Sequence, residues 1–420
     1  MLETLLNAWR VPDLRRRVLF TFYMFVIFRV GAHVPVPGIN PEALAQVMQG
    51  ALFGFFDIVS GGALKRFTVF AMGIMPYINA SIIMQLLTVV VPSLERMAKE
   101  GEDGRRKIVQ YTRYGTVLLA FIQGIGMSLY LGRASGVLLH PGIGTYLSIA
   151  VILTAGTTFL MWLGEQITEK GIGNGISLLI FAGIVARLPA EFYSIYEFVR
   201  TGTVGILTAI GFAIFAVAVV AAVVAMNEGQ RRIPVQYSKR VVGRRVYGGQ
   251  STHIPLKVNQ AGVIPVIFAM SILLFPSTIA SWFPGNALAQ GIVRVFNVSS
   301  VPYMVMYAAL IIFFTYFYTA VTFNPQDVAD NMRKYGGFIP GLRPGRPTAE
   351  YIDHVLSRLT LAGAIFLAAI AVLPTIVTGV TGLNVYFGGT SLLIVVGVAL
   401  DTVRQMESQL LMRHYQGFMK

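Results

Sequence analysis

The sequence predicts an all-α integral membrane protein with about ten transmembrane helices in two inverted five-helix halves. Three observations support this class. Of the 420 residues, 55% are hydrophobic and 12% are charged, about half the charged fraction of a soluble domain. The apolar residues form runs near 20 residues, the length of a helix that spans the hydrocarbon core. Similar segments also recur in the two halves of the chain.

The hydropathy pattern places each span in turn. The fifth is expected to be short, because Pro189 follows it, and the others are long enough to cross a tilted path through the bilayer. The predicted spans are 18–34, 68–91, 114–131, 146–164, 175–188, 204–226, 258–277, 302–322, 355–378 and 386–403.

The basic residues are distributed unevenly between the two sides that this span order creates. With the N-terminus inside, 26 of the 33 Lys and Arg residues fall in inside segments and six fall outside. Basic residues favour the cytoplasmic face, so we expect both termini to be cytoplasmic. Arg29 lies within the first span, either as a functional intramembrane charge or as a side chain that extends to the nearby outer interface. The second interpretation is favoured.

Two inside loops, at about 227–257 and 323–354, are longer than a connection requires. The first alternates Val, Tyr and Arg between turn glycines, which predicts a small basic hairpin. The second contains Gly336-Gly337 and a Pro- and Gly-rich stretch, which predicts a stiff turn-rich tip. Ordered basic projections suit docking of a large anionic partner, although positive charge there also orients the chain.

Two sequence patterns occur once in each half of the chain. Gly73-Ile-Met-Pro-Tyr-Ile-Asn-Ala80 shares GxxPxIxA with Gly262-Val-Ile-Pro-Val-Ile-Phe-Ala269. Gly175-Ile-Ser-Leu-Leu-Ile180 likewise resembles Gly389-Thr-Ser-Leu-Leu-Ile394. Because each half holds five spans, the two copies have opposite orientations in the membrane, which is an inverted repeat.

The repeated segments share isoleucines at corresponding places, Ile78 with Ile267 and Ile180 with Ile394. Ile74 and Ile176 lie one turn before Ile78 and Ile180, on the same helix face. This pattern predicts an apolar constriction of a central pore between two wetter vestibules, although ordinary helix packing explains it as well. Polar residues flank the isoleucines: Asn79, Ser81, Gln85, Asn174, Ser177, Asn259, Gln260, Thr390 and Ser391.

The segment Phe55-Phe-Asp-Ile-Val-Ser-Gly-Gly-Ala-Leu-Lys-Arg66 lies outside, just before the second span. It is apolar but too short to cross the bilayer. A re-entrant or plugging element and an interfacial surface helix are both consistent with it.

Several chemistries are excluded or disfavoured. The chain has no cysteine, no histidine pair at metal-ligand spacing and no phosphate-binding GxxxxGK[ST] loop, so we expect no metal, no cofactor and no enzymatic activity. A secondary transporter would place charged or strongly polar groups at the midplane, where isoleucines are expected. An intramembrane enzyme would need a catalytic dyad. Glu165 and Glu169 lie at the inner interface and are interpreted as capping or loop contacts.

Nearly the whole chain resembles the SecY family of protein-translocation channels. Six of the stretches that carry the resemblance are Phe28-Arg-Val-Gly31, Ala71-Met-Gly-Ile-Met-Pro-Tyr77, Glu100-Gly-Glu-Asp-Gly-Arg-Arg-Lys107, Gly171-Ile-Gly-Asn-Gly-Ile-Ser177, Pro340-Gly-Leu-Arg-Pro-Gly345 and Tyr386-Phe-Gly-Gly-Thr-Ser-Leu-Leu-Ile394.

The resemblance implies a clamshell of two halves, residues 1–200 and 201–420. It implies a plug at about 57–67 and a lateral gate between spans two and three and spans seven and eight. The implied residues are Ile74, Ile78, Ile176, Ile180, Ile267 and Ile394 for the pore ring; Asn79, Gln85 and Asn259 for the gate; and Asp57, Gly61, Gly62, Lys65 and Arg66 for the plug.

The resemblance also implies partners and a location. The small membrane subunits SecE and SecG, the motor ATPase SecA, the ribosome with its nascent polypeptide, signal sequences and the lipid bilayer are the expected partners, and the bacterial plasma (inner) membrane is the expected location. The implied partner contacts are Arg232, Lys239, Arg244, Arg245 and Arg343.

Overall fold

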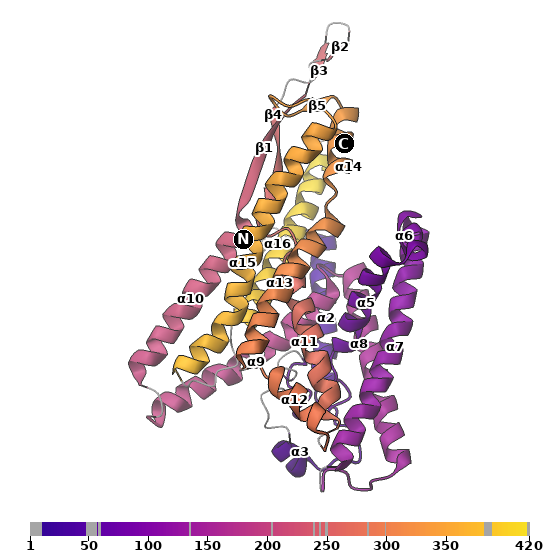
Figure 1. The fold of residues 1–420 in the computed structure, drawn as a ribbon, viewed down its shortest axis with the longest axis vertical. Coiled ribbons are helices and arrows are strands. Elements are labelled where there is room, and N and C mark those ends of the chain that lie inside the picture. The colour runs from indigo at the N-terminus through magenta and orange to yellow at the C-terminus, as the bar shows by residue number, and fades with distance from the viewer. Residues whose placement is uncertain are drawn as a thin grey trace.

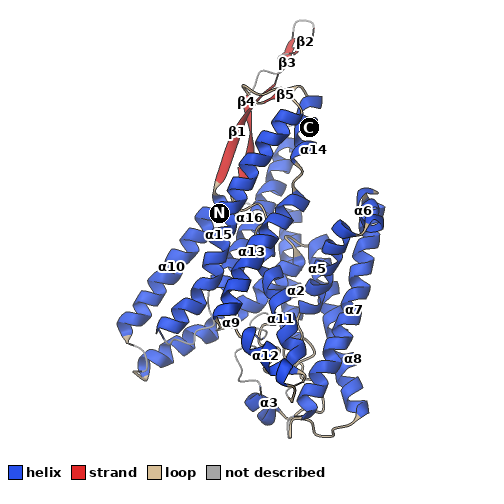
Figure 2. Ribbon diagram, viewed as in Figure 1, coloured by secondary structure: helices blue, strands red, loops and turns tan. Residues whose placement is uncertain are grey.

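The computed structural model shows a long helical molecule with a small sheet at one end (Figures 1 and 2). The structure describes residues 11–47, 57, 60–133, 136–202, 205–237, 240–242, 245–247, 251–283, 285–298, 300–381 and 389–417.

Ten of the helices correspond in order to the ten predicted spans. They are α2 (Pro12–Gly31), α5 (Met75–Val90), α7 (Glu102–Arg133), α8 (Ile143–Lys170), α9 (Gly175–Arg200), α10 (Ile206–Glu228), α11 (Ile264–Ser281), α13 (Val301–Thr322), α15 (Arg346–Thr381) and α16 (Gly389–Gly417). Shorter helices are α3 (Pro41–Val47), α6 (Pro92–Lys99), α12 (Ala287–Val295) and α14 (Pro325–Lys334).

Seven helices of the described residues are long and apolar enough to cross a membrane, or up to eight if the bent pair α5 and α6 forms one span. The protein is therefore a multi-pass membrane protein. By themselves, the helices α2 and α16 are not among those that are apolar enough to cross a membrane. Arg15, Arg16 and Arg17 lie inside α2, and Asp401 and Arg404 lie inside α16.

Two predicted span boundaries are wrong. The second span was expected from residue 68, but residues 60–74 form turns and α5 begins only at Met75. Gly73 takes a left-handed backbone (φ 57°) and Pro76 occupies the first turn of the helix, where its missing N–H leaves no bond unmade. The fifth span was expected to end before Pro189, yet α9 continues through it to Arg200.

The two halves lie side by side, with α11 between them (Figure 1). On one side stand α5, α6, α7 and α8 of the first half, and on the other α10, α13, α15 and α16 of the second. The helix α11 contacts both α5 and α7, while α9 of the first half contacts α16 of the second. The helices that share repeated segments, α5 with α11 and α9 with α16, therefore meet in pairs.

The basic hairpin predicted in the first long loop is confirmed. Strand β1 (Gln230–Tyr237) pairs antiparallel with β4 (Ser251–Lys257), with Ile233 opposite Ile254, and β2 (Arg240–Val242) pairs with β3 (Arg245–Tyr247). The second loop adds β5 (Gly337–Phe338) to the other edge of β1. The two long loops thus form one projection, with turns at Gly336, Gly341 and Gly345, all of positive φ.

Candidate functional site

The isoleucines of the predicted ring lie where the two halves meet. Ile74, Ile78, Ile180, Ile267 and Ile394 are all at most 9% exposed and belong to one apolar cluster. Ile176 is half-buried and packs against that cluster. Its Cδ1 atom lies 2.5 Å from the position that a Cβ atom on Gly164 of α8 would take. Five of the six are therefore buried in the same apolar core, and the sixth is half-buried beside it.

The three residues predicted for the gate do not form one polar cluster. Asn79 follows Ile78 in α5 and is buried. The amide of Gln85 donates to the Ser81 hydroxyl at 3.3 Å, within its own helix. Asn259 donates to the side-chain oxygen of Asn227 in α10 at 2.9 Å, a contact within the second half.

Asn259 belongs to a polar network that was not predicted from the sequence. Arg404 of α16 donates to the Asn227 carbonyl and to the Glu228 carboxylate, the latter at 2.9 Å. The network therefore joins α10, α16 and the segment that leads into α11. The available signal was Arg404 directly after the tenth predicted span, with Asp401 inside that span, because a charge at membrane depth requires a partner.

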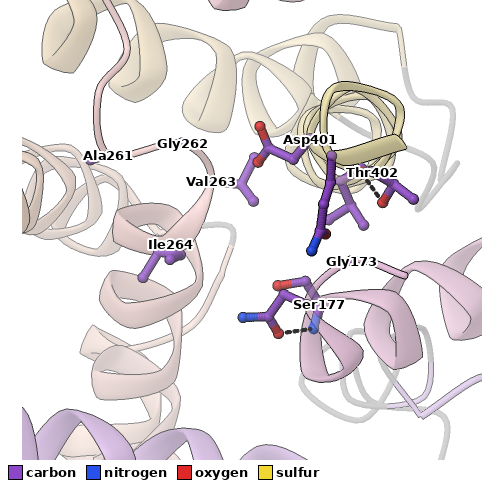
Figure 3. Close-up of a pocket in the computed structure, with 11 residues that line it drawn as sticks. Gly173, Ser177, Ala261, Gly262, Val263, Ile264, Asp401 and Thr402 are labelled. Atoms are coloured by element: carbon purple, nitrogen blue, oxygen red, sulfur yellow. Dashed lines mark hydrogen bonds between the residues drawn. The ribbon is translucent and has the colours of Figure 1, made fainter. Parts of the chain in front are cut away.

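A small cavity of about 240 Å³ lies between the halves, at the N-terminal ends of α9 and α11 and beside the middle of α16 (Figure 3). Gly173, Asn174 and Ser177 line it from the first half, and the segment 261–264 and α16 line it from the second. The Asn174 side chain accepts from the backbone N–H groups of Ile176 and Ser177, which caps α9. The wall of the cavity combines polar groups with the apolar side chains of Val263, Ile264 and Val398.

The C-terminal ends of α7 and α11 are joined across the boundary between the halves. The Arg133 guanidinium donates to the Trp282 carbonyl at 2.6 Å. The Trp282 ring covers Gly126, where a Cβ atom would come within 2.3 Å of ring carbons. These three residues were not singled out from the sequence, because the contact joins positions far apart in the chain.

The segment predicted as a plug packs inside the protein, so the interpretation as a surface helix is wrong for residues 60–67. Leu64 and Phe67 are almost fully buried. Gly61 and Gly62 have φ values of 68° and 87°, a left-handed conformation that glycine adopts without steric cost. The Lys65 and Arg66 side chains are exposed, while the backbone N–H of Lys65 donates to Asp57 at 2.8 Å.

Two arginines contact this segment. Arg187 of α9 forms a 2.6 Å ion pair with Asp57, whose side chain is 1% exposed. Arg29 of α2 donates to the Gly61 carbonyl at 2.7 Å. The half-buried Arg29 therefore has a hydrogen-bond partner within the protein, as a charged residue in a span requires.

The basic projection holds the predicted partner contacts that can be located. The side chains of Arg232 in β1 and Arg343 in the turn before α15 are exposed. Arg245 begins β3, and Lys239 and Arg244 lie outside the described residues.

The described residues contain no group of three or more His, Asp or Glu side chains that could hold a metal ion. Glu165, within α8, forms a 2.8 Å ion pair with Arg113, within α7. The interpretation of Glu165 as a capping or loop contact is therefore wrong, because this ion pair joins two helices.

Comparison with known proteins agrees with this architecture. The model of the SecY family matches residues 68–403. The chain is 51% identical to a protein translocase subunit SecY of Halalkalibacterium halodurans, over the full length of both chains. Among solved structures, one of a protein-conducting channel covers 94% of this chain and 92% of its own, with a TM-score of 0.67 at 19% identity. Sec61 in a canine ribosome-channel complex from the endoplasmic reticulum gives a TM-score of 0.64 at 18% identity, with the same coverage.

Proposed function

This chain belongs to the SecY family, and from that premise we propose how its residues form and control a protein-conducting channel. The chain is a channel subunit of a protein translocase. The observation that carries the residue-level proposal is the burial of Ile78, Ile180, Ile267 and Ile394, on four helices of both halves, and of Ile74, directly before α5, in one apolar core.

These isoleucines form the constriction through which an unfolded polypeptide passes. A peptide backbone cannot cross hydrocarbon without partners, because each unpaired polar group costs several kcal/mol. A hydrated path on either side of a short apolar ring removes most of that barrier. Isoleucine suits the ring, since it has no polar atom to bind the substrate and since an empty apolar constriction excludes water and ions.

The two halves, 1–200 and 201–420, separate along the seam between α5 and α7 on one side and α11 and α13 on the other. Asn79 and Gln85 lie on α5 of this seam, and Asn259 lies just before α11. Parting of the seam lets an apolar signal or anchor segment partition sideways into lipid. Asp57, Gly61, Gly62, Lys65 and Arg66 belong to the plug that covers the axial path.

The channel subunit is not an enzyme, so the direction of transport comes from partners. The exposed Arg232 and Arg343 side chains, with Lys239, Arg244 and Arg245, offer positive charge to a ribosome or to the SecA motor ATPase. Sec61, a structural neighbour, is known in a ribosome-channel complex. SecE and SecG complete the assembly in the bacterial plasma membrane, with both termini cytoplasmic.

The alternative of a small-solute transporter has less support. Inverted repeats also serve that class, which binds its solute with charged or strongly polar groups near the midplane. The corresponding cluster here is apolar.

Cysteine crosslinking tests the ring directly, because the chain contains no cysteine. Single cysteines replace Ile78, Ile180, Ile267 and Ile394 in turn, and a secretory polypeptide is arrested halfway across. We expect all four to crosslink to the polypeptide, and a cysteine at Ile149, buried in α8 in a separate cluster, to remain uncrosslinked. Export without crosslinking at the four positions would show that the polypeptide passes elsewhere.

A further inference from the structure

The plug segment, defined here as Asp57 and residues 60–67, is attached by polar contacts to the first half of the chain. Arg187 of α9 binds the Asp57 carboxylate, and Arg29 of α2 binds the Gly61 carbonyl. The Phe67 carbonyl accepts from the backbone N–H of Val36 at 3.0 Å. Among the described residues, every hydrogen bond or ion pair that joins the plug segment to another part of the chain goes to the first half.

The Asp57–Arg187 ion pair is the strongest of these attachments. The two side chains are 1% and 16% exposed, and Arg187 also contacts Glu191 at 3.3 Å. The second Asp57 oxygen accepts from the backbone N–H of Lys65. Removal of one partner from a buried pair leaves the other charge without compensation, which is far more costly than loss of an exposed pair.

Close packing adds to the attachment at Gly61. A Cβ atom there would lie 3.1 Å from the Cα atom of Gly183 in α9, so the backbones of the plug segment and α9 touch. The plug segment is therefore held against α9 by a glycine contact at Gly183 and by an ion pair at Arg187. These two residues are about one turn of helix apart.

We propose that the Asp57–Arg187 ion pair is a latch that keeps the plug segment on the first half when the two halves separate. This inference rests on the proposed channel function. It gives separate control to the two exits of the channel, the lateral path to lipid and the path across the membrane. Separation of α7 from α11 opens the path to lipid without breaking the latch, because both latch residues move with the same half. Transfer of a polypeptide across the membrane requires the latch to break.

The first test compares Asp57→Asn and Arg187→Gln with the matched control Glu191→Gln, which removes the neighbouring carboxylate of Arg187 but not the plug contact. Each channel complex is reconstituted in lipid. Resting ion conductance, export of a secretory protein with a defective signal, and insertion of a single-span membrane protein are measured. We expect the two latch variants to raise conductance and export at least about tenfold, while their insertion and all three readings of Glu191→Gln stay at the wild-type level.

The second test holds the latch closed. Cysteines replace both Asp57 and Arg187, and a cleavable bifunctional thiol reagent joins them. We expect the joined channel to insert the single-span protein but not to export, and cleavage of the reagent to restore export. This arm compares one folded protein with itself, so it decides the question even if a charge variant fails to fold.

Loss of both export and insertion in the joined channel would overturn the proposal, and so would unchanged conductance in the folded latch variants. Failure of the channel function itself gives a different result, since the wild-type protein would then neither export nor insert.

Discussion

The guanidinium of Arg133, at the C-terminal end of α7, donates a 2.6 Å hydrogen bond to the carbonyl of Trp282, the residue that follows α11. The two residues lie 149 positions apart in the chain and belong to opposite halves. This contact is thus a direct bond across the proposed lateral seam, and its loss affects the equilibrium between closed and parted halves.

Arg133→Ala is expected to favour the parted state. A hydrogen bond from an exposed charged group contributes about 1 kcal/mol, so the ratio of parted to closed channels rises about fivefold. Distances between spin labels on single cysteines in α7 and α11 measure this ratio. Arg294→Ala, which removes an exposed arginine from α12, is the control. An identical distance distribution in Arg133→Ala and wild type would contradict the prediction.

Gly126→Ala is expected to part the same helices by steric contact. The new Cβ atom would lie 2.3 Å from the Trp282 ring, so the ring or the helix must shift. We expect increased export of a protein with a defective signal, and reversal by Trp282→Leu in the same chain. Gly132→Ala is the matched control, since its Cβ atom meets the Tyr146 ring at 2.5 Å within the first half. Equal export by both glycine variants would argue against a role specific to the seam.

The helices, the repeat between the halves and the burial of the repeated isoleucines could be predicted from the sequence, because these depend on local hydropathy and on a pattern that occurs once in each half. It did not reveal that residues 68–74 are turns, since they are as apolar as the helix that follows. The turn depends on the left-handed conformation of Gly73. This conformation is seen only in the folded protein, where the Thr157 hydroxyl of α8 donates to the Gly73 carbonyl.

The polar contacts could not be predicted because each joins distant segments. Arg29 precedes its partner Gly61 by 32 residues, and Arg187 follows Asp57 by 130. Hydropathy identifies a charge inside or near a span but not the group that compensates it. Asn259 is a further example: its polarity is visible in the sequence, while its partner Asn227 on α10 is 32 residues away.

Arg404→Ala is expected to destabilise the second half. It removes the donor to the Asn227 carbonyl and to Glu228 and frees the end of α10 that positions Asn259. We expect the free energy of unfolding to fall by about 2 kcal/mol, measured as thermal unfolding in nanodiscs. Arg346→Ala is the control, because its ion pair with Glu350 is largely exposed and contributes little. A greater loss in Arg346→Ala would refute the assignment of the network.

Ile78→Ser and Ile267→Ser are expected to increase the ion leak of the resting channel. Each hydroxyl lets water enter an otherwise apolar constriction, and planar-bilayer conductance should rise several-fold. Ile149→Ser places the same change in a separate buried cluster of the first half, and should lower stability without a leak. If the leak of all three variants equals that of wild type, the isoleucines serve only in packing.

Arg343→Glu is expected to impair motor-driven export. Arg343 is exposed in the turn before α15. Its carbonyl accepts from the Thr348 hydroxyl at 2.9 Å, so the backbone is fixed independently of the side-chain charge. Reversal of the charge repels an anionic docking surface and leaves the fold intact. Export driven by SecA in proteoliposomes should fall while the resting conductance stays at the wild-type level.

The control is Arg96→Glu, on α6 away from the projection, which should retain export. If export falls equally in both variants, the effect is due to total charge on that membrane face. Undiminished export in Arg343→Glu would exclude this turn as a motor contact.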